Sequence, residues 1–196
     1  MIRWVYEEHL ARQLVDLPGR ICVLLADRDM AAAPGKIREC VEWCRDAGIG
    51  AVIFHISTPD PAGMAEYLPD LRRIAEVARL TLHIGEATET AGAGMEVTVA
   101  IGKSGREEIA ACIRRMAEDG VDPDAVDERT FEQYLTFRYA PDLVIKTGGD
   151  HLTDFLIWQS VYSELFFSDV NWPLFRRLDL LRALRDYQSR VRRFGR

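Results

Sequence analysis

The sequence lacks the features of a membrane-spanning or secreted protein. No apolar run approaches the roughly 20 residues of a membrane-spanning helix. The N-terminal stretch MIRWVYEEHL carries acidic residues where a signal peptide is apolar. We therefore expect a cytoplasmic protein without a transmembrane segment, and peripheral association with a membrane stays open. At 196 residues the chain is long enough for one α/β domain with a sizeable core and short for two.

Cysteine and histidine are scarce. The chain has four of each, no CxxC pair, and histidines that are scattered along the sequence. Cys40 and Cys44 lie four residues apart on an expected helix, so they share one face and can bind a metal with help from histidine. Buried, reduced thiols are the interpretation that we favour for the cysteines.

Positive charge is scarce over most of the chain and concentrated at its end. Lys and Arg number 25 against 31 Asp and Glu, which argues against a general nucleic-acid binder, and 48% hydrophobic residues argue against a disordered chain. From Asn171 to Arg196 there are eight Arg and two Asp, so this tail carries about +6 on an otherwise acidic body. Such a tail suggests an anionic ligand or partner.

Short apolar runs alternate with helical patterns. Such runs are typical of strands buried on both faces of a parallel sheet. We predict a single α/β domain over residues 1–196, with a central, mostly parallel six-stranded sheet flanked by helices. Strands are expected at 21–26, 51–56, 81–84, 95–101 and 142–145; helices at 3–17, 35–47, 62–79, 104–119, 130–135, 153–162 and 178–191, the last two flanking ELFFSDV.

Two polar segments directly follow expected strands, where parallel sheets bind ligands. Asp27 follows the first strand, and Lys146-Thr147-Gly148-Gly149 follows the run DLVI. Glycines let backbone N–H groups approach a phosphate, and lysine adds charge. The spacing is not that of a Walker motif, and an ordinary strand-to-helix turn explains the glycines equally well.

The chain ends in SRVRRFGR. Arg190, Arg192 and Arg193 can clamp a diphosphate, because guanidinium groups match phosphate oxygens. Composition alone favours a solvated helix end, where arginines also suit the helix dipole.

Five separate matches, within three stretches of the second half, occur in the order of one known family. The stretch PDLVIKTGGDHLTDFLIWQSVYSELFFSDVNWPLF and the final RVRRFG follow the patterns DLxIRTGGExRxSxFLxWQxxYxE, FxxxxWPxF and RxRRFG. In these motifs the chain resembles the cis-prenyltransferases, the family of undecaprenyl and dehydrodolichyl diphosphate synthases. Asp27 stands where the family's DGNGRWA motif begins, and SGREEI (104–109) is similar to GGRxDI.

The resemblance implies a Mg²⁺-dependent condensation of an allylic diphosphate with isopentenyl diphosphate. It makes Asp27 the candidate catalytic residue, and Asp27 and Glu164 the candidate metal-associated carboxylates. The implied diphosphate-binding residues are Lys146, Thr147, Gly148, Gly149, Thr153, Arg190, Arg192 and Gly195.

The first half departs from the family pattern. After Asp27 the chain reads RDMAAAPG in place of GNGRWA, so the phosphate-loop glycines are missing, and Asp29 would repel a diphosphate. The second motif is one residue short, and HISTPDP replaces SxENWxRP. The stretch that builds the family's hydrophobic tunnel, between the second and fourth strands, is also shortened.

Three hypotheses remain. The first is an accessory subunit, of the Nogo-B-receptor-like kind, in a heterodimer or heterotetramer. It supplies Arg190, Arg192 and Gly195 to a catalytic partner that makes long-chain polyprenyl diphosphate, with ELFFSDVNWPLF as the candidate dimer interface. The alternative is a stand-alone homodimeric short-chain enzyme that uses Asp27, Lys146 and Glu164. The third is a prenyl-lipid binding protein without chemistry.

Overall fold

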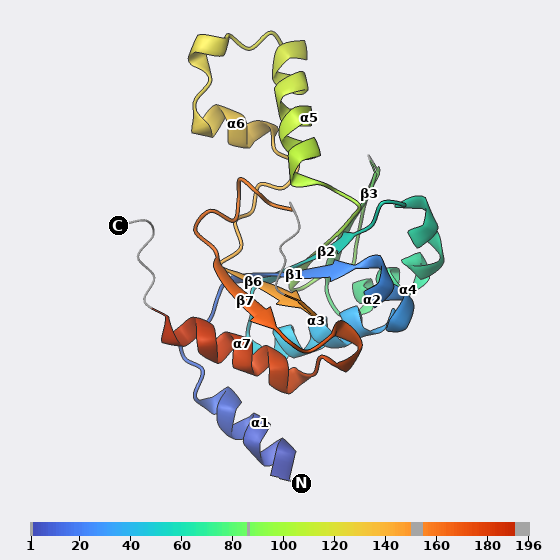
Figure 1. Cartoon of the computed structure of the whole chain (residues 1–196), viewed down its shortest axis with the longest axis vertical. Coiled ribbons are helices and arrows are strands. Elements are labelled where there is room, and N and C mark those ends of the chain that lie inside the picture. Colours follow the sequence, from blue (N-terminus) through green and yellow to red (C-terminus); the bar gives the residue numbers. More distant parts are fainter. Residues whose placement is uncertain (1, 86, 150–154, 191–196) are drawn as a thin grey trace.

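A seven-stranded sheet forms the centre of the computed structural model (Figure 1), which describes residues 2–85, 87–149 and 155–190. The strand order is β4-β3-β5-β2-β1-β6-β7, and every neighbouring pair is parallel except β3 and β4. The strands are β1 (Arg20–Ala26), β2 (Ala51–Ser57), β3 (Arg79–Ile84), β4 (Ala87–Ala91), β5 (Glu96–Ile101), β6 (Leu143–Thr147) and β7 (Glu164–Ser168).

Helices connect the strands and lie on both sides of the sheet. In Figure 1, α3 and α7 lie on one side, and α5 and α6 extend away from the other. The helices are α1 (Ile2–Arg12), α2 (Asp27–Ala32), α3 (Lys36–Ala47), α4 (Leu68–Arg72), α5 (Gly105–Glu118), α6 (Glu128–Tyr134) and α7 (Arg177–Ser189), and the short 3-10 helices are η1 (Ala62–Tyr67), η2 (Arg73–Glu76), η3 (Pro123–Ala125) and η4 (Trp172–Leu174).

The two faces of the sheet are covered differently. One face, here the helix face, packs against α3, α7 and the segment 62–76, whose buried side chains include Ile37, Leu71 and Leu184. The opposite face, here the loop face, presents a smaller cluster from the strands that is covered by Phe137, Phe155 and Leu156, none of which lies in a helix. Alternation along each strand assigns successive residues to opposite faces.

The fold class was predicted correctly, but not the number of strands. We expected six strands, and β4 adds a seventh in a Gly/Ala/Thr-rich segment that we had interpreted as a turn. All five β4 residues are exposed, so the strand carries no apolar pattern. It is held by its ladder with β3 and by a forked pair between Arg72 and Glu89, with N···O distances of 2.9 and 2.7 Å.

Three expected helices are shorter or absent. The helix expected over 62–79 is divided into η1, α4 and η2, in a stretch that contains Gly63 and Pro69. Residues 155–162 form turns instead of a helix, and Leu156 has a φ of 54° there, outside the helical range. The first helix ends at Arg12 instead of residue 17. Ser104 caps α5 as predicted, because its side chain accepts the N–H of Glu107.

The four cysteines are all free and buried, as expected. Within the described ranges no group of three or more His, Cys, Asp or Glu side chains is arranged to hold a metal ion. No helix in the same ranges is long and apolar enough to cross a membrane.

Candidate functional site

The first candidate site lies at the carboxyl edge of the sheet, where β1 and β6 are neighbours. Leu24 of β1 is paired with Lys146 of β6, so the turn that begins at Asp27 and the loop Lys146–Gly149 leave the sheet side by side. The structure therefore brings together Asp27 and four of the predicted diphosphate-binding residues. Parallel sheets bind ligands at this edge.

Two aspartates shape the turn after β1. Asp27 is exposed, and its Oδ1 accepts the N–H of Arg28 at 2.6 Å. Asp29 is half-buried, and its Oδ2 accepts the N–H of Ala26 at 2.9 Å, which fixes the start of α2. The backbone here forms a helical turn in place of a glycine loop.

Lys146 brings positive charge to the same place. Its side chain is half-buried, and its Nζ donates to the carbonyl of Thr147 at 3.0 Å. Burial lowers the pKa of Lys146; the nearby Asp29 carboxylate opposes this shift, and the Arg28 guanidinium adds to it. Lys146 therefore lies within electrostatic reach of the β1–α2 turn.

The backbone conformation and the close neighbours of residue 148 require a glycine at that position. Its φ is 63°, and a Cβ there would lie 2.5 Å from Oδ1 of Asn171. The Gly148 N–H donates to the carbonyls of Ser168 and Val170, so the loop is fixed to the segment after β7. Among the described residues, no atom lies within 4 Å of the Cβ position of Gly149, so this part of the chain leaves the backbone there open to a ligand.

Thr147 is the buried member of this loop, with only 2% of its surface exposed. Its Oγ1 has no hydrogen-bond partner among the described residues. Thr147 follows Lys146 in the strand and therefore faces the opposite side of the sheet, the helix face.

Glu164 and Arg190 lie together at the opposite edge of the sheet. Glu164 is level with Leu143, and Leu143 with Ile21, six residues before Asp27. Six strand residues span about 20 Å, so Asp27 and Glu164 of one chain cannot bind the same metal ion. Glu164 Oε2 instead pairs with Nη1 of Arg190 at 2.9 Å, and the pKa of Arg190 is raised by Glu164 and Asp186.

Three predicted site residues, Thr153, Arg192 and Gly195, lie outside the described residues.

A cavity of about 360 Å³ lies at the carboxyl ends of β2 and β5, apart from the site at β1 and β6. We did not predict it from the sequence. His55, Ser57 and Lys103 are among its lining residues, and His55 Nε2 lies 2.7 Å from the carbonyl oxygen of Lys103. The strand 95–101 is followed by Gly102-Lys103-Ser104. A lysine and a glycine thus follow this strand, as they follow the strand that ends at Lys146. The same pattern could have been used to predict a ligand site here.

Five cavities in the described part of the chain have no lining residue from α3 or from residues 62–76. One cavity of about 230 Å³ lies over the loop face, against β1, β6 and β7. Its lining residues are Cys22, Leu24, Val144, Phe155, Leu156, Ile157, Ser160 and Leu165.

Comparisons with known proteins agree with this arrangement. The sequence profile of a family described as "Putative undecaprenyl diphosphate synthase" matches residues 64–195. A (2Z,6E)-farnesyl diphosphate synthase of Mycolicibacterium smegmatis is 34% identical, with 97% of this chain and 94% of that protein aligned. A tritrans,polycis-undecaprenyl-diphosphate synthase (geranylgeranyl-diphosphate specific) of Thermoplasma volcanium is 45% identical over 82% of this chain and 77% of its own.

The crystal structure of lavandulyl diphosphate synthase from Lavandula x intermedia has the same fold. Its TM-score is 0.73 at 22% sequence identity, over 92% of this chain and 99% of that one. A mostly parallel sheet with a lysine and a glycine loop at its carboxyl edge is typical of α/β proteins that bind anionic ligands. The chain belongs to the cis-prenyltransferase family.

Proposed function

We propose that this chain is a stand-alone, homodimeric prenyl transferase that joins an allylic diphosphate to isopentenyl diphosphate and makes a short product. The observation that carries the proposal is the position of the Asp27 turn beside the Lys146–Gly149 loop at one point of the carboxyl edge. In the reaction the allylic C–O bond breaks, diphosphate leaves, a C–C bond forms to the isopentenyl unit and a proton is lost.

Lys146 and Gly149 are suited to a diphosphate. The Lys146 ammonium supplies positive charge, and the open backbone at Gly149 lets phosphate oxygens approach. Asp29 opposes such binding, because its negative charge is close enough to attract the Lys146 ammonium and would repel a diphosphate. Because one lysine beside one aspartate offers little net positive charge, the site suits a diphosphate whose own negative charge is partly neutralised.

Asp27 fits a magnesium ion that arrives with its diphosphate. Mg²⁺ is usually held by one or two carboxylates together with substrate phosphates, not by a cage of protein ligands. Asp27 is exposed at the carboxyl edge, and its Oδ1 accepts the backbone N–H of Arg28. Magnesium, when bound, neutralises charge on the leaving diphosphate.

A short product is supported by the space available. Five cavities in the described part of the chain have no lining residue from α3 or from residues 62–76, and the cavity on the loop face is about 230 Å³. Pockets for drug-sized ligands span roughly 300–1,000 Å³. The Mycolicibacterium relative, which aligns over nearly its whole length, is named for a short-chain product.

Turnover by the purified chain tests the proposal. With dimethylallyl diphosphate, labelled isopentenyl diphosphate and Mg²⁺, we expect product from the unaltered chain and at least about a hundredfold lower kcat for Asp27→Asn. Glu118→Gln, an exposed change at the far end of α5, is the matched control and should keep the activity. Equal rates for Asp27→Asn and the unaltered chain would contradict the role of Asp27.

A second candidate, the accessory subunit of a heteromeric enzyme, is favoured by the turn after β1. Asp29 and the helical backbone there replace the family's glycine loop. Such a subunit would be silent alone and would stimulate a partner that carries DGNGRWA, and its last four residues would be needed. Full stimulation by a chain that lacks residues 193–196 would remove this candidate.

A further inference from the structure

A groove of about 300 Å³ lies between α6 and the turn segment 155–162, and the function proposed above does not use it. Neither Asp27 nor the Lys146–Gly149 loop is among its lining residues. Its two walls differ in chemistry. The lining includes Glu128, Glu132 and Arg138 on one side and Trp158, Val161 and Tyr162 on the other.

The wall formed by the turn segment is apolar and open to solvent. Val161 and Tyr162 are each 67% exposed, and Ile157 of the same segment is 42% exposed. The Trp158 ring packs against Phe131 of α6, with 4.6 Å between ring centroids, and so joins the two walls. Neighbouring apolar side chains that stay exposed beside a groove are typical of a surface that binds an apolar group.

Hydrogen bonds hold this apolar wall in place. The Gln159 side-chain amide donates to the carbonyl of Phe137, and the Ser163 hydroxyl donates to the carbonyl of Pro141 at 2.6 Å. The Ser163 N–H donates to the carbonyl of Ser160 at 3.0 Å and closes a turn. The groove is therefore formed before a ligand arrives, and binding requires little further ordering of this wall.

The wall formed by α6 is acidic. Glu128 and Glu132 are four residues apart in this helix, so they lie on one face, and both are exposed. Arg138 also lines the groove, but its guanidinium donates to the carbonyls of Gln133 at 2.7 Å and Leu135 at 3.4 Å. Two carboxylates facing an apolar wall suit a peptide that carries both arginine and aromatic side chains.

A segment of this composition follows α7 in the same chain. Residues 191–196 read Val-Arg-Arg-Phe-Gly-Arg, with three arginines and one aromatic ring. Their charge is opposite to that of the α6 carboxylates, and Phe194 matches the apolar wall. The groove and the segment are therefore complementary in charge and in polarity.

The segment also begins beside the groove. Arg190, the residue before it, pairs with Glu164 through its Nη1 at 2.9 Å. Glu164 comes two residues after Tyr162, which lines the groove. Six extended residues span about 20 Å, whereas the seven residues of α6 are about 10 Å long. The segment is therefore long enough to enter the groove and to run along it.

We infer that residues 191–196 dock in the groove of their own chain. Phe194 lies against the apolar wall, and arginines of the segment pair with the two α6 carboxylates. Docking keeps Arg192 and Gly195 away from a diphosphate site, because the groove and such a site cannot hold the segment at the same time. The inference concerns the position of the segment and does not depend on the proposed reaction.

Disulfide trapping in the full chain tests the inference. The four native cysteines are buried, so an exposed pair introduced by substitution reacts first under a mild oxidant. Tyr162→Cys combined with Phe194→Cys should form a disulfide within one chain, which non-reducing electrophoresis shows at the mass of a single chain.

Val15→Cys combined with Phe194→Cys is the matched control for proximity. Val15 is 85% exposed, and its N–H donates to Gln188 Oε1 at 2.7 Å, so it also lies near the end of α7. A docked segment should be trapped at residue 162 at least about fivefold faster than at residue 15, because docking raises the local concentration of one thiol near the other. Equal rates would overturn the inference. A disulfide between two chains would place the segment on a second copy and would overturn it as well.

Charge reversal tests the acidic wall. Glu128→Lys combined with Glu132→Lys, in the chain with cysteines at 162 and 194, should slow trapping about threefold or more at low salt. Glu118→Lys combined with Asp122→Lys makes the same change of charge at exposed residues outside the groove lining. This control should leave the rate within about 1.5-fold. Equal slowing by both pairs would show that only overall charge matters and would contradict docking at α6.

Hydrogen exchange on the chain with its native cysteines guards against misfolding of the trapping variants. Phe194→Ser changes no residue that lines the groove. It should raise the exchange rate of backbone amides in the segment 155–162 about threefold or more, and it should leave the amides of β1 and β2 unchanged. Unchanged exchange in 155–162 would overturn the inference.

The docking and the proposed function can fail separately. Preferential trapping at residue 162 in a chain without turnover would support docking and refute the proposed activity. Turnover by a chain that is trapped equally at residues 15 and 162 would support the activity and overturn docking.

Discussion

Lys146 lies in the candidate diphosphate site, but its position is partly shielded from water and therefore disfavours its charged form. The side chain is half-buried, and burial lowers its pKa, so it loses its proton at a lower pH than an exposed lysine does. Between the lowered pKa and that of the unfolded chain, the folded protein binds fewer protons. The free energy of unfolding therefore rises with pH in that window.

A pair of variants at Lys146 tests this description. Lys146→Met should weaken inorganic diphosphate binding about tenfold to a hundredfold, since a charged hydrogen bond is worth about 1.5–3 kcal/mol. It should also remove the alkaline rise in unfolding free energy. Lys146→Arg should retain binding at alkaline pH, where the unaltered chain loses it. A Lys146→Arg chain that loses diphosphate affinity at alkaline pH in parallel with the unaltered chain would contradict the role of the lysine charge.

Gly148 is constrained by its backbone and by its neighbour. A side chain there would take up a φ of 63° and meet Asn171 Oδ1 at 2.5 Å. Gly148→Ala should therefore lower the free energy of unfolding by about 1–3 kcal/mol in urea titrations. Gly35 has a φ of −74° and, in the described part of the chain, no atom within 4 Å of its Cβ position, so Gly35→Ala should be within about 1 kcal/mol of the unaltered chain. Equal losses would contradict the constraint.

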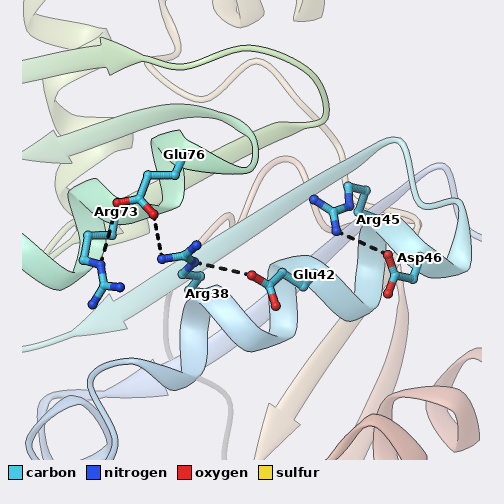
Figure 2. Close-up of polar contacts among 6 residues, drawn as sticks. All are labelled: Arg38, Glu42, Arg45, Asp46, Arg73 and Glu76. Atoms are coloured by element: carbon cyan, nitrogen blue, oxygen red, sulfur yellow. Dashed lines mark hydrogen bonds and ion pairs between the residues drawn. The ribbon is translucent and has the colours of Figure 1, made fainter.

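At the scale of elements, packing holds the helix face closed more than the surface ion pairs do. Figure 2 shows Arg38 between Glu42 and Glu76, and Arg73 also reaching Glu76. The Glu76 side chain is 55% exposed, and pairs in such positions contribute at most about 1 kcal/mol. Leu71 of α4, by contrast, is completely buried in the core of this face.

Two variants separate these contributions. Leu71→Ala should lower the free energy of unfolding by about 2–5 kcal/mol, because it leaves a cavity in the helix face. Glu76→Gln should lower it by less than about 1 kcal/mol. Denaturant titrations of both variants, with the unaltered chain as reference, measure the difference. A larger loss for Glu76→Gln would show that the ion pairs close this face.

Elements with an apolar signal were predictable, and those without one were not. The runs ICVLLA and AVIFHI predicted β1 and β2, because a strand buried on both faces is apolar throughout. Strand β4 carries no such signal, because every residue in it is exposed. The apolar periodicity of 62–79 predicted one helix, but only α4, between η1 and η2, is α-helical there.

At the scale of the whole molecule, the sheet register decides which site residues can cooperate. The sequence placed Asp27 and Lys146 at one edge correctly, because each directly follows or ends an apolar strand. It grouped Glu164 with them through the family motif alone. Only the pairing of β6 with β7 reveals that Glu164 begins its strand at the far edge, beside Arg190.

The predicted interface segment ELFFSDVNWPLF is divided between core and surface. Trp172 and Phe175 are completely buried, whereas Phe167 of the edge strand β7 and Leu174 are 42% and 62% exposed. Exposed apolar groups at a sheet edge suit association with a second copy.

Sedimentation of charged variants tests this surface. Phe167→Asp combined with Leu174→Asp should convert the proposed dimer to monomer at micromolar concentration. Ile113→Asp, at a 57% exposed position on α5, is the control and should leave the dimer intact. A dimer that survives the double change would place the interface elsewhere.

The central claim is that the chain alone transfers prenyl groups and makes a short product. The most direct measurement is the chain length of the product that the purified protein makes from labelled isopentenyl diphosphate, dimethylallyl diphosphate and Mg²⁺. We predict Mg²⁺-dependent product limited to a few isoprene units. The absence of product from the chain alone, together with long-chain product when a DGNGRWA-bearing partner is added, would contradict the claim.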